Sequence, residues 1–347
     1  MILDAHRPAR AAAPAAALPP ALSVRGLRAY YRVSHFGIRR EVRAVDDISL
    51  EIGRNEIYGL AGESSSGKST LIRTIAGAIR PPLYRVDGSV TFDFPGLGRR
   101  AIYEMTPAER AAIRWGHLSY IMQASMSVLN PVRRVRHSFR DFAFRHMARP
   151  EPAFWQAVER HLERLHLPAA VLGAYPHELS GGMRQRVVIA LATICRPDFV
   201  IADEPTTALD VVVQKDVLAM IREVQRAMGS SVLFVTHDIA VHANLTDRLG
   251  IMYAGRLVEE GPTRALLAAP RHPYTRHLIA SLPRIGDRTP KAGLGGSPPN
   301  LAAPPPGCRF HPRCPIAMAI CREVVPPMEM AAPGHRVACH AASGAAP

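Results

Sequence analysis

Residues 62–70 of the chain have the residue types and the spacing of a loop that binds phosphate. They fit the pattern of a glycine, four further residues, and then Gly-Lys followed by Ser or Thr. In such a loop the backbone N–H groups and a helix N-terminus surround the anionic phosphates, the lysine adds a positive charge, and the next hydroxyl contacts Mg²⁺. We therefore expect Lys68 at the outer phosphates of a nucleotide and Ser69 at Mg²⁺. The expected nucleotide-binding residues of the loop are Gly62, Glu63, Ser64, Ser65, Ser66, Gly67, Lys68, Ser69 and Thr70.

The segments on either side of the loop support this interpretation. The apolar run at residues 55–61 predicts a buried strand, and residues 71–77 predict a helix. Ser65 stands where related loops often carry glycine, and serine tolerates a positive φ less readily than glycine does. We therefore expect a slightly strained loop that still binds nucleotide.

Two adjacent carboxylates, Asp203 and Glu204, close an apolar run that begins at Phe199. In nucleotide hydrolysis one group holds Mg²⁺ and another positions the attacking water, so we expect Asp203 at the metal and Glu204 at the water. His237 ends a later apolar run and is expected to contact the γ-phosphate and orient that water. Gln123 ends a further run and is expected to sense both Mg²⁺ and the water. Alone, each side chain would be read as structural, but the phosphate loop favours catalytic roles.

The strands and helices that position these residues are indicated by the spacing of apolar residues. Further strands are predicted at 21–31, 44–52, 86–94, 118–123, 199–204 and 231–238, with a hairpin at 249–260. We expect residues 86–94 to form an edge strand with a turn at Asp87-Gly88. A capping box that begins at Thr106 and helical spacing elsewhere predict helices at 106–115, 187–195, 211–228 and 263–269. Residues 133–178 read as an inserted helical segment.

Composition limits the classes of function. The chain has 347 residues, a hydrophobic content of 48% and a net charge of +14. A basic balance is compatible with nucleic acid or an anionic membrane, but the sequence contains no nucleic-acid-binding module, so we expect no nucleic-acid partner. No apolar run approaches the roughly 18–20 residues that span a bilayer. Residues 1–20 lack the pattern of a signal peptide, which indicates a disordered tail and a cytoplasmic protein.

Four of the five cysteines crowd into the last forty residues: Cys308, Cys314, Cys321 and Cys339. In a cytoplasmic chain such a cluster favours a metal or iron–sulfur site over a set of disulfides. No pair has the Cys-x-x-Cys spacing of zinc ribbons. The preceding residues 283–307 are rich in proline and glycine and read as a linker, whereas Cys195 lies in an apolar helical pattern and reads as a core residue.

Together, these motifs resemble the ATP-binding subunit of an ABC transporter over roughly residues 21 to 260. Residues 179–186 look like the signature motif of that family and are the most specific match. The phosphate loop resembles its Walker A motif, residues 199–204 its Walker B motif, Gln123 its Q-loop, residues 208–210 its D-loop and His237 its switch histidine. The resemblance implies that Tyr31, with Tyr30 as second choice, stacks on the base.

The resemblance also implies a mechanism with two heads. Two such domains face head to tail, and Ser180, Gly181 and Gly182 of one close over the nucleotide of the other, with Gln185 and Asp210 also counted among the nucleotide-binding residues. Closure would act on a permease through the Q-loop and the helical subdomain, and ATP hydrolysis would reset the open state.

A finer resemblance is to the oligopeptide/dipeptide importer subfamily. It is carried by residues 126–132, by His272-Pro-Tyr-Thr and by the segment around Cys308 and Cys314. This resemblance implies a 4Fe–4S cluster held by the four C-terminal thiolates, with structural zinc and an empty thiol-rich tail as the alternatives. Residues 123–126 differ from the usual Gln-Asp-Pro of peptide importers, which leaves an oligosaccharide cargo open beside oligopeptides or dipeptides; nickel is a further alternative.

The expected fold is α/β, with a P-loop NTPase core, an antiparallel β subdomain, an inserted helical subdomain and a small C-terminal Cys-rich iron–sulfur module. The expected divisions are a disordered tail at 1–20, an ABC ATPase domain at 21–282 with its helical subdomain at about 124–185, a linker at 283–307 and the Cys-rich module at 308–347. Because the linker separates the module from the ATP site in sequence, we expect loss of the cluster to leave the residues of the ATP site untouched.

The expected function is that of an ATPase that uses ATP and Mg²⁺ to power the import of a substrate through a membrane permease. The subunit is expected to be peripheral, on the cytoplasmic face of the cell membrane. The implied partners are a second ABC ATPase, as a paralogue, two membrane permeases and an extracytoplasmic substrate-binding protein. Two alternatives belong to other classes. A soluble ABC protein of DNA repair or translation usually has two heads or a coiled-coil insertion, and a regulatory module with a decayed ATPase would have lost Lys68, Glu204 or His237.

Overall fold

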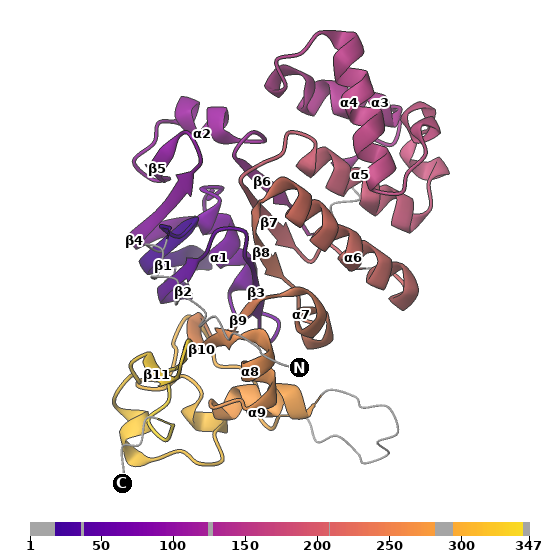
Figure 1. Ribbon diagram of the computed structural model, residues 1–347. Helices are drawn as coiled ribbons and strands as arrows, with labels where there is room; N and C mark the ends of the chain where they lie inside the picture. Colours follow the sequence, from indigo (N-terminus) through magenta and orange to yellow (C-terminus); the bar gives the residue numbers. More distant parts are fainter. Residues whose placement is uncertain (1–17, 36–37, 124–127, 208, 282–293, 343–347) are drawn as a thin grey trace, which may run out of the picture.

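The computed structural model describes residues 18–35, 38–123, 128–207, 209–281 and 294–342. Sequence predictions for residues 1–17, 124–127, Ala208 and 282–293 lie outside these residues. The described chain forms two sheets with helices around them (Figure 1). No helix in these ranges combines the length and the apolar character needed to cross a membrane.

The larger sheet has eight strands, in the order β11-β12-β10-β9-β3-β8-β7-β6. Its parallel centre places β3 beside β8 and β9, β7 beside β8, and β6 beside β7. The bounds of these strands are Ile57–Ala61 for β3, Leu118–Ile121 for β6, Phe199–Asp203 for β7, Ser231–Val235 for β8 and Arg248–Tyr253 for β9. Because parallel strands end at one edge of a sheet, the loops after β3, β8, β7 and β6 gather at that edge.

The smaller sheet is antiparallel, in the order β2-β1-β4-β5. The strands are β1 Leu22–His35, β2 Ile38–Ile52, β4 Leu83–Phe94 and β5 Gly98–Ala101. Helix α1, Lys68–Ile75, packs between the two sheets, and its Leu71 and Ile72 are fully buried in the core that both sheets share.

The edge-strand prediction for residues 86–94 is wrong. Strand β4 lies inside its sheet, and β5, which the sequence pattern did not indicate, forms the edge. Gly88 has a φ of 88° yet stays within β4, opposite an irregularity in β1 between Arg25 and Arg28. A Cβ at Gly88 would come within 2.5 Å of the carbonyl oxygen of Gly26. The glycine therefore marks a close approach of two strands rather than a turn.

Most of the helices lie where helical patterns were predicted. Helix α2 begins after the capping box of Thr106, and the inserted segment contains α3 and α4. The helices not yet given have the following bounds: α2 Pro107–Ile113, α3 Val135–Phe142, α4 Glu151–Arg164, α5 Gly181–Thr193, α6 Val211–Met228, α7 Ile239–Leu245, α8 Thr263–Ala268 and α9 Pro273–Ala280. In Figure 1 helices α3, α4 and α5 stand apart from the small antiparallel sheet, on the far side of β6 and β7.

The C-terminal residues join the central sheet. Strand β10, Arg256–Pro262, pairs with β9 and also with β12, His335–Val337, which in turn pairs with β11, Glu329–Ala332. Phe310 is 1% exposed and packs with Tyr253 and Tyr274 in one core cluster. The Cys-rich segment is therefore built onto the same sheet as the phosphate loop, and it lies beside β10 and α9 in Figure 1.

Candidate nucleotide site

The phosphate loop connects β3 to α1, as the pattern predicts. Gly67 precedes the helix with a φ of 103°, and a Cβ there would come within 2.0 Å of the carbonyl oxygen of Ala44. A Cβ at Gly62 would come within 2.1 Å of the carbonyl oxygen of Met252. Both glycines are therefore required by the close approach of other backbone segments.

Lys68 extends across this loop. Its Nζ donates to the carbonyl oxygens of Gly62 at 2.7 Å and Glu63 at 2.8 Å and to Ser66 Oγ at 3.3 Å. Burial lowers the pKa of Lys68, and the negative charges of the neighbouring carboxylates oppose that shift. The ammonium group is thus held inside the loop, where the phosphates of a nucleotide would bind.

Ser65 has the strained conformation that its position in the motif predicts. Its φ is 63°, in the left-handed region where a non-glycine residue costs about 1–2 kcal/mol. Ser64 beside it is not among the residues with positive φ. The strain is thus confined to the position where related loops carry glycine.

Asp203, the last residue of β7, is the candidate metal ligand. Its side chain is buried, and its Oδ1 has no hydrogen-bond partner among the described residues. Burial, followed by the charge of Glu204, raises the pKa of Asp203 to about 6. A buried carboxylate oxygen without a donor is suited to a cation, so this residue fits Mg²⁺.

Glu204 has a strained backbone and a well-held side chain. Its φ is 47°, and its N–H donates to Val235 at 2.8 Å. The carboxylate accepts from His237 Nδ1 at 3.0 Å, Thr207 Oγ1 at 2.9 Å and Gln123 Nε2 at 3.4 Å. Burial raises the pKa of Glu204, but the hydrogen bonds from His237 and Thr207 outweigh it and leave the pKa below its ordinary value. The predicted catalytic residues therefore meet, although they follow three different strands.

A cavity of about 400 Å³ gathers most of the predicted nucleotide residues. The phosphate loop, Gln123, Asp203, Glu204 and His237 all contribute to its wall. Tyr31 also lines it and its Oη lies 3.1 Å from Thr70 Oγ1. Tyr30, by contrast, is buried elsewhere and donates to Asp46 at 2.6 Å. The geometry thus separates the two candidate tyrosines.

The signature residues and the described D-loop residues, Leu209 and Asp210, do not line this cavity. Ser180 precedes α5, and its Oγ accepts from the N–H of Met183 at 3.3 Å. Gly181 and Gly182 open the same helix, in which Gln185 is buried. Asp210 precedes α6, and its Oδ1 accepts from the N–H groups of Val212 and Val213 at 3.1 and 3.0 Å.

Sequence reasoning missed several residues at the site. Val42 and Ala44 of β2 and Leu301 of the proline-rich segment line the cavity. Arg313 makes an ion pair with Glu63 of the phosphate loop. The linker separates the Cys-rich module from the ATP site in sequence, but Arg313 brings the two into contact in the structure. No sequence signal marked these contacts, because they join segments far apart in the chain.

The four C-terminal cysteines lie near one another. The N–H of Cys308 donates to the carbonyl oxygen of Cys321 at 2.9 Å. Burial raises the pKa of the Cys308 thiol to about 11, and the other three thiols add to this shift. However, no group of three or more His, Cys, Asp or Glu side chains in the described ranges is placed to hold a metal ion. The predicted 4Fe–4S cluster and its zinc alternative are therefore not supported by the structure.

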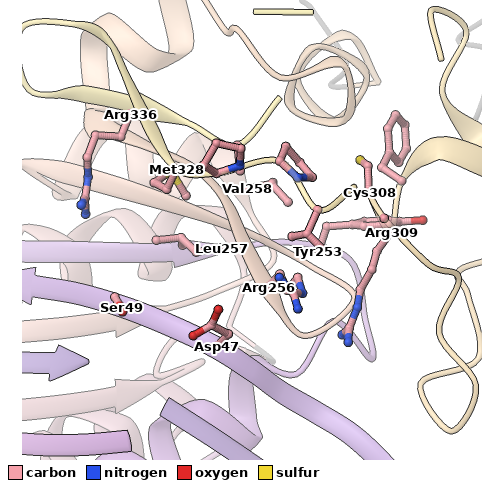
Figure 2. A pocket seen from close by; sticks show the side chains of 16 residues that line it. Asp47, Ser49, Tyr253, Arg256, Leu257, Val258, Cys308, Arg309, Met328 and Arg336 are labelled. Carbon is pink, nitrogen blue, oxygen red and sulfur yellow. The ribbon is translucent and has the colours of Figure 1, made fainter. Parts of the chain in front are cut away.

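A second cavity, of about 380 Å³, lies where the Cys-rich segment meets β2 and β10. Figure 2 shows Asp47 and Ser49 on one side, Arg256 and Leu257 in the middle, and Arg309 entering from the Cys-rich segment.

Comparisons with known proteins agree with this geometry. A family described as "ABC transporter" matches residues 45–207, and one described as "Oligopeptide/dipeptide transporter, C-terminal region" matches residues 258–321. The dipeptide transport ATP-binding protein DppD of Bacillus subtilis is 39% identical over 305 residues, covering 86% of this chain and 89% of that protein. The oligopeptide transport ATP-binding protein OppD of Salmonella typhimurium is 38% identical over 302 residues, covering 86% and 88%. A dimeric structure of MJ0796, a bacterial ABC transporter cassette, has a TM-score of 0.60 at 24% identity and covers 70% of this chain and 99% of its own.

Proposed function

As the chain belongs to the family of ABC transporter ATP-binding proteins and is an ATPase, we propose that its hydrolysis of ATP powers the import of dipeptides or oligopeptides through a membrane permease. The match of residues 258–321 to the C-terminal region of oligopeptide/dipeptide transporters carries this proposal. The names of the two curated relatives support it. Neither name supports the oligosaccharide or nickel alternatives, and the transporter family argues against a soluble non-transport role.

The residues at the sheet edge have different roles in ATP hydrolysis. The amide groups of the phosphate loop and Lys68 would bind the phosphates, while Ser69 and Asp203 would hold Mg²⁺, which when bound supplies positive charge to the phosphates. Glu204 has a lowered pKa and so is ionised near neutral pH, ready to accept a proton from water. The Nδ1–H of His237 orients this carboxylate, and Gln123 approaches it from the end of β6.

We place Tyr31 against the base, because it lines the cavity whereas Tyr30 is buried against Asp46. Its hydrogen bond with Thr70 orients the ring at the wall of the cavity. An aromatic face there offers stacking area to a purine.

A second ATPase head would complete the site. The signature residues Ser180, Gly181 and Gly182 lie outside the cavity of their own chain, and Ser180 is exposed. That placement favours their use on the nucleotide of a partner, and the similar cassette structure of MJ0796 is described as dimeric. The proposed assembly contains a paralogous ATPase, two permeases and an extracytoplasmic binding protein, with this chain peripheral on the cytoplasmic face.

The carboxylate of Glu204 provides the decisive experiment on the ATPase residues. Glu204→Gln keeps the shape of the side chain but removes its capacity to accept a proton, so we expect turnover to fall by about 100-fold or more while MgATP still binds. Lys68→Ala removes charge from the phosphate loop and should instead weaken nucleotide binding. Transport of a labelled dipeptide in the reconstituted complex tests the cargo. Wild-type turnover by Glu204→Gln, or ATP-driven uptake of an oligosaccharide but not of peptides, would contradict the respective assignment.

We also propose that Cys308, Cys314, Cys321 and Cys339 hold a 4Fe–4S cluster. The subfamily resemblance supports the cluster, and so does the mutual influence of the four thiols on the pKa of Cys308. The described residues contain no group of three or more His, Cys, Asp or Glu side chains placed to hold a metal ion, so the proposal rests on the subfamily resemblance and on the nearness of the four thiols. Metal analysis of anaerobically purified protein should find about four irons and four sulfides per chain. Stoichiometric zinc without iron would refute the cluster.

A further inference from the structure

Glu63, the second residue of the phosphate loop, is held by a side chain 250 residues away in the sequence. Arg313 Nη1 lies 3.0 Å from one carboxylate oxygen of Glu63, and Nη2 lies 3.2 Å from the other. The side chain of Arg313 is only 6% exposed and that of Glu63 is 27% exposed. This is a two-contact ion pair in a partly buried position, where its geometry and charge matter more than at the surface.

The backbone of Glu63 is held as well. Its N–H donates to the Oη of Tyr274 at 2.8 Å, and its carbonyl oxygen accepts from Lys68 Nζ at 2.8 Å. The ring of Tyr274 is buried, and its centroid lies 4.6 Å from that of Tyr253 and 5.6 Å from that of Phe310. Side-chain and backbone contacts therefore fix the peptide whose carbonyl oxygen faces the phosphate-binding lysine.

Arg313 is itself fixed by its surroundings. Its guanidinium donates to the carbonyl oxygen of Gly295 at 2.9 Å and to the Oη of Tyr253 at 3.3 Å. The residue ends the short helix His311–Arg313, next to Cys314. A few residues earlier, the buried Arg309 reaches Asp46 of β2 and the carbonyl oxygen of Ala254, and Figure 2 shows it extending from the Cys-rich segment toward the cassette. These contacts hold the guanidinium of Arg313 in place beside Glu63.

The residues that lead into the Cys-rich module also reach the nucleotide cavity; we call residues 294–342 together the Cys-rich extension. Leu301 lines that cavity, and its carbonyl oxygen accepts from the N–H of Arg43 in β2 at 2.9 Å. Pro298 and Leu301 line an adjoining cavity of about 250 Å³ together with Ser64 and Ser65. The extension therefore contacts Glu63 of the phosphate loop through Arg313 and shares two cavities with the loop.

We propose that Arg313 is a positioning residue of the ATP site, through which the Cys-rich extension sets the affinity for nucleotide. Two physical effects act in the same direction. The ion pair fixes the loop before the nucleotide binds, so that less conformational freedom is lost on binding. It also neutralises the carboxylate of Glu63, which would otherwise repel the phosphates of a nucleotide bound in the same loop. The proposal rests on the ATPase activity and is independent of what the four cysteines hold.

The test is a double-mutant cycle on the full-length chain, with the Kd for MgADP measured by calorimetry. Arg313→Ala should raise the Kd about tenfold, as expected for a coupling of this kind. In a Glu63→Gln background the same substitution should change the Kd by no more than about twofold, because the charge it neutralises is gone. In the ATPase assay of the assembled transporter, Arg313→Ala should raise KM and leave kcat within about twofold, since Glu204 and His237 follow other strands.

Arg322→Ala is the matched control, because Arg322 is an exposed arginine of the same module and should leave the Kd unchanged. An equal loss of affinity in both Glu63 backgrounds would overturn the proposal, because Arg313 would then act only through the fold of the module. An unchanged Kd for Arg313→Ala would overturn it as well. If Arg313→Ala does not fold, Arg313→Lys replaces it. Lysine keeps the charge but cannot hold both carboxylate oxygens of Glu63, which predicts about threefold weaker binding, and wild-type affinity of that variant would refute the role.

Discussion

The buried carboxylate of Asp46 forms an ion pair with Arg309 that joins the Cys-rich extension to the cassette, and its charge can be removed without changing its shape. Tyr30 donates to it at 2.6 Å, Arg256 lies 3.4 Å away, and the guanidinium of Arg309 forms an ion pair with it. The side chains of Asp46 and Arg309 are 8% and 5% exposed. Burial raises the pKa of Asp46, but the hydrogen bond from Tyr30 and the charge of Arg309 outweigh it, and the net pKa is lowered.

Asp46→Asn would leave the charge of Arg309 buried without a counter-ion. Removing one partner of a buried pair costs about 3–5 kcal/mol, and we expect the lower value because Arg309 also donates to the backbone of Ala254. The unfolding entropy is about 2.1 cal/mol/K per residue. For a chain of this length, a loss of about 3 kcal/mol in the free energy of unfolding therefore lowers the Tm by roughly 4 °C. Calorimetry or urea unfolding of the full chain measures this loss.

Asp47→Asn is the matched control. Asp47 is the next residue, its side chain is 47% exposed, and its arginine partner lies 3.9 Å away. Its φ is 66°, which asparagine tolerates, so the substitution adds no backbone strain. The free energy of unfolding should change by no more than about 0.5 kcal/mol. If the two variants lose equal stability, the buried charge cluster does not hold the extension and the reasoning fails.

Two further predictions concern strain and acid stability. Ser65→Gly should raise the free energy of unfolding by about 0.5 kcal/mol, since relief of the positive φ slightly exceeds the entropy cost of glycine; Ser64→Gly, without that strain, should lower it, and urea unfolding that showed the reverse order would be contrary evidence. Burial lowers the pKa of both His161 and His242 to about 4. Each folded pKa lies below the unfolded value, so the stability is present at neutral pH and is lost as the pH falls from about 6.5 toward 4, by about 2 kcal/mol per histidine at pH 5. Thermal unfolding at pH 7.5 and pH 5 measures this loss of stability. In the His161→Gln variant the loss between the two pH values should be smaller. An unchanged loss in that variant would exclude His161 as a source.

The C-terminal thiols show what residue identity alone can predict about a metal or cluster site. The number and spacing of the cysteines indicated a metal or cluster site, and the structure brings the four together. It does not place any three of the described His, Cys, Asp or Glu side chains around a metal ion. Residue type is readable from the sequence, but the distances between ligands depend on how a segment with little core of its own packs against β10 and β2.

The amino-acid sequence by itself determined those features that depend on short stretches of residues. The phosphate loop, the carboxylates at the end of β7 and the capping box of Thr106 each occupy fewer than ten residues, so local spacing and backbone preference suffice to predict them. The same local logic misread Gly88, because a positive φ suits both a turn and the close approach of two strands, and only the neighbouring strand decides between them.

Tertiary structure alone decided what joins distant segments. The order of the parallel strands brings Gln123, Glu204 and His237 together, and packing separates Tyr31 from Tyr30. The contact between Arg313 and Glu63 bridges 250 positions and has no local pattern. It exists because the extension adds strands to the sheet that carries the phosphate loop, and long-range pairing of this kind is set by the burial of a shared core, which no short stretch of sequence encodes.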